Sequence, residues 1–228
     1  MNKAKNIAII VGAGKGKRMG NEDKIFLNIN KKPILAHTIS PFEKCNSIDD
    51  IILVVRENNI NLTKNIIHRY KFKKVKKIIS GGKERQDSVY NALQKIDKCN
   101  YILIHDAARP LIKKQLIKEV LYAAKKYGAA IPAVPLKDTI KTGDKFVEKT
   151  LERDTLHLVH TPQAFKYEIL KEAYEFAKET KYYGTDDASL VKRLGYKIKI
   201  VPSYFENIKI TVPNDLVIAE TLLKKKTF

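Results

Sequence analysis

A glycine-rich turn near the start of the chain carries the residue types needed to hold a phosphate group. Gly12, Gly14 and Gly16 alternate with other residues directly after the apolar run Ile7–Val11. Glycine lets backbone N–H groups approach a phosphate closely, and the start of a following helix adds further donors. The spacing therefore predicts a phosphate-binding loop made from Gly12, Ala13, Gly14, Lys15 and Gly16, with the cations Lys17, Arg18 and Lys24 close by.

Two common phosphate-loop patterns do not fit this turn. A Walker A loop would have glycine at position 11 and serine or threonine at position 18, where this chain has Val11 and Arg18. A dinucleotide fingerprint would have glycine or alanine at position 17, which is Lys17. A tight strand-to-helix turn without a ligand is the plain alternative. With a ligand, the cations favour phosphoryl or nucleotidyl transfer, which needs fixed positive charge and no nucleophile from the protein.

A second glycine turn, Gly81-Gly82, follows an apolar run and opens a helical stretch. Such a turn at a helix start aims backbone donors at one point, and Lys83 would contribute through its backbone. Ser88 has two explanations that the sequence leaves open: a ligand contact, or a hydrogen bond to its own helical turn.

A third polar segment, His105–Pro110, follows the apolar run that begins at Tyr101. In open α/β sheets, ligands bind at the carboxyl ends of the strands. Asp106 is a candidate for a metal ion or a ribose hydroxyl, and Arg109 for a substrate phosphate. The alternative is a buried Asp–Arg pair that caps the next helix.

Lys209 lies between two isoleucines, so strand alternation would turn it away from them. It is either a phosphate ligand or part of a solvated face. His105, His157 and His160 match no metal-ligand spacing and are interpreted as structural.

The elements that must position these residues follow from an alternation of β-branched runs and amphipathic stretches. The pattern predicts strands at Ile7–Val11, Ile51–Val55, Val75–Ile79, Tyr101–His105, Ala129–Val134, Lys197–Val201 and Ile208–Thr211. It predicts helices at Ile34–Lys44 (kinked or ended by Pro41), Ile60–Tyr70, Asp87–Ile96, Lys113–Tyr127, Lys166–Lys178 and Asp186–Leu194, and one from Pro213 with Asp215 in its first turn. This order predicts an α/β fold with a mostly parallel sheet and helices on both faces. The segment Leu136–Asp154 breaks the rhythm and is expected to leave the sheet as an arm.

Length and charge limit the possible partners. The chain has 228 residues and a net charge of +19, so its partners should be anionic. No apolar run is long enough to span a membrane, and the apolar stretch near the start is too short for a signal peptide. No basic–aromatic motif typical of RNA-binding sheets is found. Two cysteines make no disulfide scaffold, and we expect a single cytoplasmic domain over residues 1–228 that binds neither membrane nor nucleic acid.

The motifs occur in one order along nearly the whole chain, from about Ile7 to Leu223. In sequence they are the glycine loop with Arg18-Met19, Lys24, Gly81-Gly82 with Ser88, His105-Asp106-Ala107-Ala108-Arg109-Pro110, Asp138-Thr139-Ile140-Lys141, Arg153, Thr161-Pro162-Gln163, Thr185-Asp186-Asp187-Ala188-Ser189 and Asn207-Ile208-Lys209-Ile210-Thr211. This ordered set resembles the 2-C-methyl-D-erythritol 4-phosphate cytidylyltransferase family.

The resemblance implies an open, mostly parallel, Rossmann-like sheet with helices on both faces and a protruding β-arm. It also implies in-line attack of the substrate phosphate on the α-phosphate of CTP, which gives a CDP-alcohol and pyrophosphate in non-mevalonate isoprenoid biosynthesis. Mg²⁺ would be bound mainly through the CTP phosphates, with Asp106 as its candidate protein ligand. The implied assembly is a homodimer whose arms, residues 136–154, cross between subunits.

Roles for individual residues follow from the same resemblance. Arg18 and Lys24 match the cations that stabilise the transition state, and Arg153 and Lys209 are added to this catalytic set. The nucleotide-binding positions are Gly12, Ala13, Gly14, Lys15, Gly16, Gly81, Gly82, Lys83, Ser88, Asp106 and Ala107. The substrate-binding positions are Arg109, Thr139, Arg153, Thr161, Thr185 and Lys209, of which Thr139 and Arg153 would reach the site from the partner's arm.

Three positions depart from the family pattern, and two other functions remain to be weighed. Gly12, Asp23 and Ile25 stand where alanine, proline and glutamine are usual; we expect Gly12 to loosen the loop and Asp23 to weaken the field of Lys24. The first alternative is a ribitol 5-phosphate cytidylyltransferase, although such proteins tend to have valine in place of Ala108. The second is a non-catalytic basic RNA-binding protein, which would bind with a steep salt dependence and show no turnover.

Overall fold

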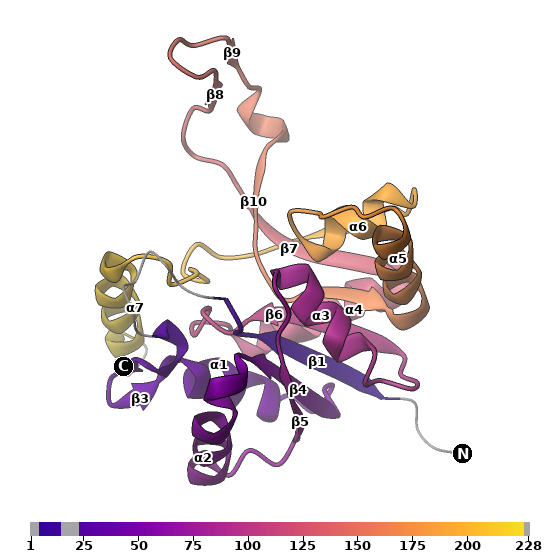
Figure 1. Cartoon of the computed structure of the whole chain (residues 1–228). Helices are drawn as coiled ribbons and strands as arrows, with labels where there is room; N and C mark the ends of the chain where they lie inside the picture. Colours follow the sequence, from indigo (N-terminus) through magenta and orange to yellow (C-terminus); the bar gives the residue numbers. More distant parts are fainter. Residues whose placement is uncertain (1–4, 15–22, 226–228) are drawn as a thin grey trace.

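The computed structural model describes residues 5–14 and 23–225, and its centre is an eight-stranded sheet (Figure 1). The strand order is β10-β7-β11-β6-β1-β4-β5. Outside this order, β12 also pairs with β7, in the parallel direction. The strands are β1 (Asn6–Val11), β4 (Asp50–Val55), β5 (Val75–Ser80), β6 (Tyr101–Asp106), β7 (Ala129–Pro135), β10 (His157–Val159), β11 (Gln163–Lys166) and β12 (Lys199–Pro202). β5, β4, β1 and β6 are mutually parallel, so their carboxyl ends share one edge of the sheet.

Helices cover both faces of this sheet because its central strands are apolar on both sides. Ala8 and Ile10 of β1 face a core built with helices α1 (Ile34–Glu43), α2 (Ile60–Tyr70) and α4 (Lys114–Tyr127). Ile7 and Ile9 face the opposite core, built with α3 (Arg85–Leu93), α5 (Tyr167–Glu179) and α6 (Asp187–Arg193). Successive strand residues point to opposite faces, so one apolar run supplies both cores. The predicted α/β fold with a mostly parallel sheet is confirmed.

A third, smaller core holds the last helix, α7 (Pro213–Lys225), against the β2–β3 hairpin. The two hairpin strands are Asn28–Ile29 and Lys32–Pro33. Asp215 lies in the first turn of α7, as predicted, and its carboxylate accepts the backbone N–H groups of Thr211 and Val212 at 2.7 and 2.9 Å. These bonds satisfy donors at the helix start and fix the segment that carries Lys209.

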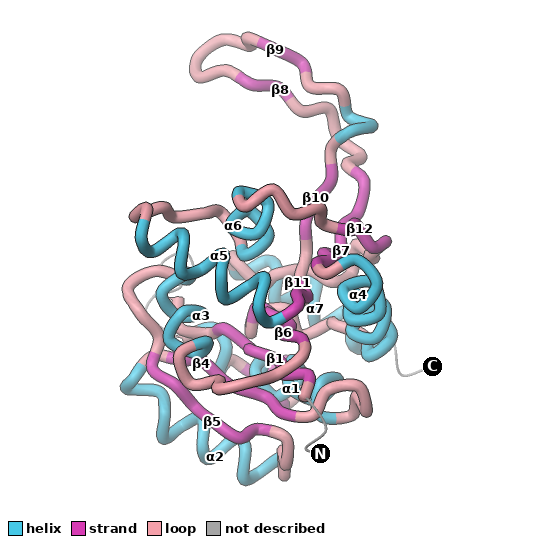
Figure 2. The backbone as a smooth tube through the Cα atoms, turned by 90° about the vertical axis from the view of Figure 1, so that its right-hand side faces the viewer, coloured by secondary structure: helices cyan, strands magenta, loops and turns pink. Residues whose placement is uncertain are grey.

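An arm, residues 136–156, stands away from the sheet between β7 and β10 (Figures 1 and 2). It contains a hairpin of β8 (Lys141–Thr142) and β9 (Lys149–Thr150), followed by the short 3₁₀ turn η4 (Arg153–Thr155). Its base is closed by the Leu136 N–H, which donates to the Leu156 carbonyl at 3.2 Å. The hairpin tip exposes 85% of Phe146 and 66% of Val147.

One predicted strand is absent from the structure, and several short strands were not predicted. The strand expected at Ile208–Thr211 is wrong: the segment makes no strand pairing, although the Ile210 N–H donates to the Ala108 carbonyl at 2.9 Å. Pro41 lies inside α1, which ends soon after it, at Glu43. β10 and β11 run antiparallel to successive parts of β7 and were missed because they are short. Among the described residues, no helix has the length and apolarity that a membrane span requires.

Candidate active site

The two glycine turns and the segment after β6 meet at the carboxyl edge of the parallel strands. Backbone hydrogen bonds tie them to neighbouring strands: Gly12 N–H to the Val54 carbonyl, Ala107 N–H to Val11, and Gly81 N–H to Val55, at 2.7 to 2.9 Å. Each turn therefore begins from a fixed point on the sheet. This is the edge at which the sequence predicted a phosphate site.

Gly81 allows the two glycine turns to touch. A Cβ at this position would lie 2.2 Å from the Ala13 Cβ and 2.9 Å from the Ser88 hydroxyl, so any larger residue would push the loops apart. Ser88 is buried, and its hydroxyl donates to the Glu84 carbonyl at 3.0 Å while it accepts the Gly82 N–H at 3.1 Å. In this structure Ser88 thus shapes the turn that presents Gly82. Lys83 is exposed beside it.

Gly12 is packed rather than loose, contrary to expectation. A Cβ on Gly12 would lie 2.8 Å from the Ile25 side chain and 3.0 Å from the Ala107 Cβ. Ile25 is only 2% exposed, so its side chain fills the space that a methyl group on residue 12 would need. The two departures from the family pattern, Gly12 and Ile25, therefore belong together.

Asp106, buried at the end of β6, is the centre of a group of charges in which Arg109 is buried and Arg85 and Lys209 are partly exposed. Its carboxylate lies 3.0 Å from the Lys209 Nζ, 3.2 Å from the Arg85 Nε and 3.5 Å from the Arg109 Nε. Burial alone would raise the pKa of Asp106, but Arg85, Lys209 and Arg109 hold it well below its usual range. We call these four residues the Asp106 cluster. Of them, the sequence reasoning had assigned roles to Asp106, Arg109 and Lys209.

Arg85 is the member of the cluster that the sequence reasoning missed. It lies at the start of α3, where its Nε donates to Asp106 and its Nη2 donates to Asp187 at 2.8 Å. Asp187 is fully buried and also accepts the Tyr174 hydroxyl at 2.5 Å. Burial and Asp187 together raise the pKa of Tyr174 well above its ordinary value, so the phenol stays protonated and donates. Arg85 follows the Gly81-Gly82 turn closely in the sequence, and this position is the signal that could have identified it.

The Arg109 side chain points toward the segment that carries Lys209. Its Nη1 donates to the Asn207 carbonyl at 2.6 Å, and the Asn207 amide donates to the Thr161 carbonyl at 2.9 Å. Arg109 Nε and Asn207 Oδ1 are buried without a hydrogen-bond partner in the described structure. Asn207 thus joins three segments and was named in the sequence only as a neighbour of Lys209.

Thr161 is predicted to bind substrate, yet its hydroxyl is used inside the protein. It accepts the Asp106 N–H at 3.1 Å and lies 2.8 Å from the His105 Nδ1. Burial lowers the pKa of His105 to about 3, so the ring is neutral and Nδ1 accepts the hydroxyl proton. The other nitrogen, Nε2, then donates to the Arg109 carbonyl at 3.3 Å. The His105 ring is thus used inside the protein, where it contacts the Arg109 carbonyl directly and the Asp106 N–H through the Thr161 hydroxyl.

The remaining predicted residues fall into three groups. Lys24 lies in the 3₁₀ turn η2 (Lys24–Phe26), and Gly14 and Thr185 are exposed on loops. Thr139 and Arg153 lie on the arm, where the Arg153 Nη1 donates to the Lys137 carbonyl at 3.2 Å and its Nε is 4.0 Å from Asp154. Lys15, Gly16, Lys17 and Arg18 lie outside the described residues.

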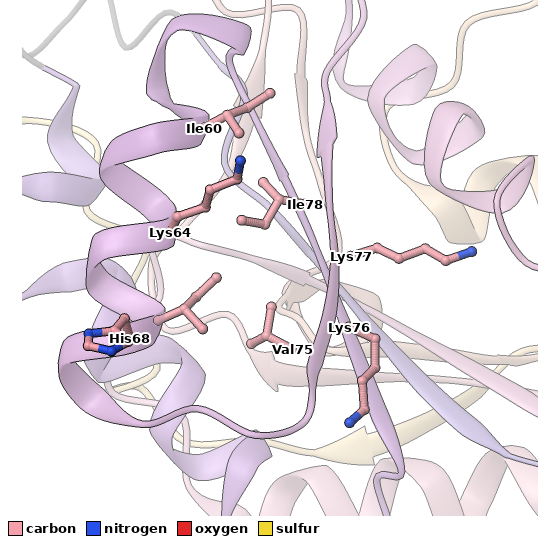
Figure 3. A pocket seen from close by; sticks show the side chains of 8 residues that line it. Ile60, Lys64, His68, Val75, Lys76, Lys77 and Ile78 are labelled. Carbon is pink, nitrogen blue, oxygen red and sulfur yellow. The ribbon is translucent and has the colours of Figure 1, made fainter.

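A surface hollow of about 520 Å³ lies elsewhere, between α2 and the outermost strand β5 (Figure 3). Ile60 from α2 and Val75 and Ile78 from β5 give it an apolar lining, and Lys64 and Lys76 also line it. Its lining includes none of the predicted site residues. The predicted site residues that the structure describes therefore lie away from this hollow.

Two glycine turns and several fixed cations lie together at one edge of the parallel sheet. Such an arrangement supplies the backbone donors and the positive charge that transfer of a nucleotidyl group requires. Comparison with known proteins agrees: this is a nucleotidyltransferase with a Rossmann-like sheet. The family model of 2-C-methyl-D-erythritol 4-phosphate cytidylyltransferase matches residues 6–225. The chain belongs to that family.

Individual relatives cover almost the full length. The 2-C-methyl-D-erythritol 4-phosphate cytidylyltransferase of Dehalococcoides mccartyi is 49% identical over 220 residues, which is 96% of each chain. That of Alkaliphilus oremlandii is 46% identical over 230 residues, 99% of this chain and 98% of the relative. Among solved structures, the 4-diphosphocytidyl-2C-methyl-D-erythritol synthase of Anaerococcus prevotii is 29% identical with a TM-score of 0.86, covering 97% of this chain and 99% of that one.

Proposed function

We propose that this protein transfers the cytidylyl group of CTP to 2-C-methyl-D-erythritol 4-phosphate. A phosphate oxygen of the acceptor attacks the α-phosphate of CTP in line, the bond from that phosphorus to the bridging oxygen breaks, and pyrophosphate leaves. The product is 4-diphosphocytidyl-2-C-methyl-D-erythritol, an intermediate of non-mevalonate isoprenoid biosynthesis. The observation that carries the proposal is the Asp106 cluster, in a chain that matches this family over residues 6–225.

The fixed cations account for how the chain would promote this step. Two phosphate-bearing substrates bring many negative charges into one site, and charge shifts toward the leaving oxygen as the bond breaks. Lys209 and Arg109 are held near each other by Asp106, so they need little reorganisation to receive the acceptor phosphate. Lys24, with Arg18 from the glycine loop, would act on the triphosphate. The loop backbone that follows Gly12 and Gly82 would hold the nucleotide, since the Gly12, Gly81 and Gly82 N–H groups already donate to Val54, Val55 and Ser88.

Mg²⁺ fits this site as an ion carried mainly by the nucleotide. No group of three or more His, Cys, Asp or Glu side chains in the described part of the chain could hold a metal by itself. Asp106 is an ionised carboxylate at the strand end that already pairs with Arg85, Arg109 and Lys209, so it would contact Mg²⁺ only together with substrate phosphates, which commonly bind this ion with one or two carboxylates. When bound, the ion would offset phosphate charge. The residue proposed to contact it is Asp106.

The arm is proposed to complete the site of a second subunit in a homodimer. Thr139 and Arg153 are exposed, and the arm carries them away from the sheet of their own chain (Figure 1). The exposed Phe146 and Val147 at its tip would be covered in such a dimer. We further propose a cytoplasmic location, in agreement with two unpaired, buried cysteines, Cys45 and Cys99.

The experiment that tests the function is pyrophosphate release with CTP and Mg²⁺, with two acceptors offered in parallel. We expect release with 2-C-methyl-D-erythritol 4-phosphate and little with ribitol 5-phosphate. Release with ribitol 5-phosphate alone would keep the transfer chemistry and overturn the acceptor. If folded protein releases no pyrophosphate with either acceptor and binds RNA with a steep salt dependence, the proposed enzymatic function is overturned and the RNA-binding alternative is favoured. The comparisons support neither alternative.

A further inference from the structure

Asp23 directly precedes Lys24 and was expected to weaken its positive field. The structure gives this carboxylate a partner on another loop. Arg56 donates to the Asp23 Oδ2 from Nε at 3.1 Å and from Nη2 at 2.9 Å, and the Asn59 amide donates to the same oxygen at 2.5 Å. The Asp23 side chain is only 8% exposed and the Arg56 side chain is 31% exposed, so the carboxylate is shielded from water while the guanidinium is partly solvated. The Arg56 charge therefore offsets the Asp23 charge next to Lys24.

These contacts join two segments that are far apart in the sequence. Arg56 directly precedes the 3₁₀ turn η3 (Glu57–Asn59), and Asn59 is the last residue of that turn. The turn follows the carboxyl end of β4. On the other side, the Asp23 carbonyl accepts the Phe26 N–H at 2.9 Å, which begins the turn η2 that carries Lys24. The start of η2 is thus attached to the sheet edge at which the nucleotide loops meet.

The residue after Lys24 fixes the same turn from the opposite direction. Ile25 is buried, and its side chain occupies the space beside Gly12 and Ala107. Lys24 consequently lies between two anchored residues, one held by charge and one by packing. A turn that is held on both sides keeps the Lys24 backbone in place when its side chain meets a phosphate.

We propose that Asp23 is a positioning residue for Lys24, acting through its ion pair with Arg56 and its hydrogen bond with Asn59. The pair fixes the turn that presents Lys24 and neutralises the carboxylate that would otherwise oppose it. The proposal rests on the proposed function, because it assigns Lys24 to the transfer step. Asp23 has φ −76° and ψ 102°, a backbone conformation that proline also adopts. A proline ring at this position would therefore hold the turn without any charge.

The test compares Asp23→Ala, Arg56→Ala, the double variant and Asp23→Pro in the pyrophosphate-release assay. We expect Asp23→Ala to lower kcat about 10- to 100-fold, with a smaller change in KM for CTP, because the displaced cation acts mainly as charge develops. Arg56→Ala should be at least as severe, since it leaves an unpaired carboxylate beside Lys24. The double variant should be no worse than Arg56→Ala, and Asp23→Pro should recover most of the activity.

Asp50→Ala is the matched control, because Asp50 pairs with Lys5 at 2.7 Å at the amino end of the same strand, β4. It should leave kcat unchanged, and melting curves of all variants identify any loss caused by unfolding. Wild-type kcat in Asp23→Ala, strictly additive losses in the double variant, or an Asp23→Pro enzyme as slow as Asp23→Ala would each overturn the proposal.

A second readout separates this proposal from the proposed function. The rate at which an amine-specific reagent labels Lys24, followed by peptide mass spectrometry, should rise in Asp23→Ala and Arg56→Ala and stay unchanged in Asp50→Ala. If wild-type protein releases no pyrophosphate but the labelling changes as expected, the function fails and the positioning of Lys24 stands. Unchanged labelling in both Asp23→Ala and Arg56→Ala would overturn the positioning role whatever the activity.

Discussion

The Asp106 cluster and the arm carry the same kinds of charged residue in opposite surroundings. Asp106 and Arg109 are buried, with carboxylate-to-cation distances of 3.0 to 3.5 Å in the cluster. On the arm, the Arg153 side chain is 53% exposed and lies 4.0 Å from an Asp154 that is 91% exposed. The first group is ordered by its own chain. The charged residues of the arm have few contacts within their own chain that would order them. This is the physical reason for proposing that a partner subunit orders them.

The largest expected effect comes from making the same substitution in both regions. Asp106→Asn removes the charge that Arg85, Arg109 and Lys209 share, and breaking a buried ion pair costs about 3–5 kcal/mol. Asp154→Asn should leave stability unchanged, because a weak, exposed pair contributes almost nothing. Urea unfolding of both variants checks this contrast. Equal shifts in the two would show that burial does not distinguish the regions.

The second effect concerns activity without stability. Arg153→Ala should lower kcat/KM about 100-fold, because it removes a cation from the acceptor phosphate, while the unfolding midpoint stays the same. Mixing the impaired Arg153→Ala and Lys24→Ala subunits should restore part of the activity, since each mixed dimer would hold one intact site. Absence of recovery, with subunit exchange confirmed by mass spectrometry, would contradict a site shared between subunits.

The smallest effect is a pH dependence confined to the buried region. Burial lowers the pKa of His105 to about 3 and that of His160 to about 4. Between these values and about 6.5, the unfolded chain binds protons that the folded chain does not, so stability falls as the pH drops from 7 to 5. The expected loss is about 1–2 kcal/mol for each histidine. Urea midpoints across this range measure it, and His160→Gln should make the dependence shallower; an unchanged slope would exclude His160 as a source.

The regular elements were predictable because their patterns are local. The helix at Ile60–Tyr70 has the predicted bounds, and the central parallel strands differ from prediction by one residue at an end. Ile208–Thr211 failed because alternation of apolar residues also occurs in an extended segment. There the Ile210 N–H meets the Ala108 carbonyl and Lys209 turns to Asp106, without a strand ladder.

The site was predictable where residues follow strand ends and not where partners come from distant helices. Asp106, Arg109 and Lys209 belong to polar segments next to apolar runs, so their convergence could be expected. Arg85 and Asp187 are 102 positions apart, and no spacing rule connects them. Arg56 gave no signal either, because one arginine after a strand resembles any solvated residue until Asp23 is placed beside it.

The outermost strand, β5, has a consequence for the protein at high concentration. Its consecutive residues Lys76 and Lys77 are exposed, at the point where the register of β5 against β4 shifts, and Figure 3 shows the Lys77 side chain pointing away from α2. A bare strand edge is a template on which another chain can add, and lysines there make such addition costly. Part of the positive charge of this chain thus acts as protection against aggregation, and reagents that neutralise lysines should remove that protection before they disturb the fold.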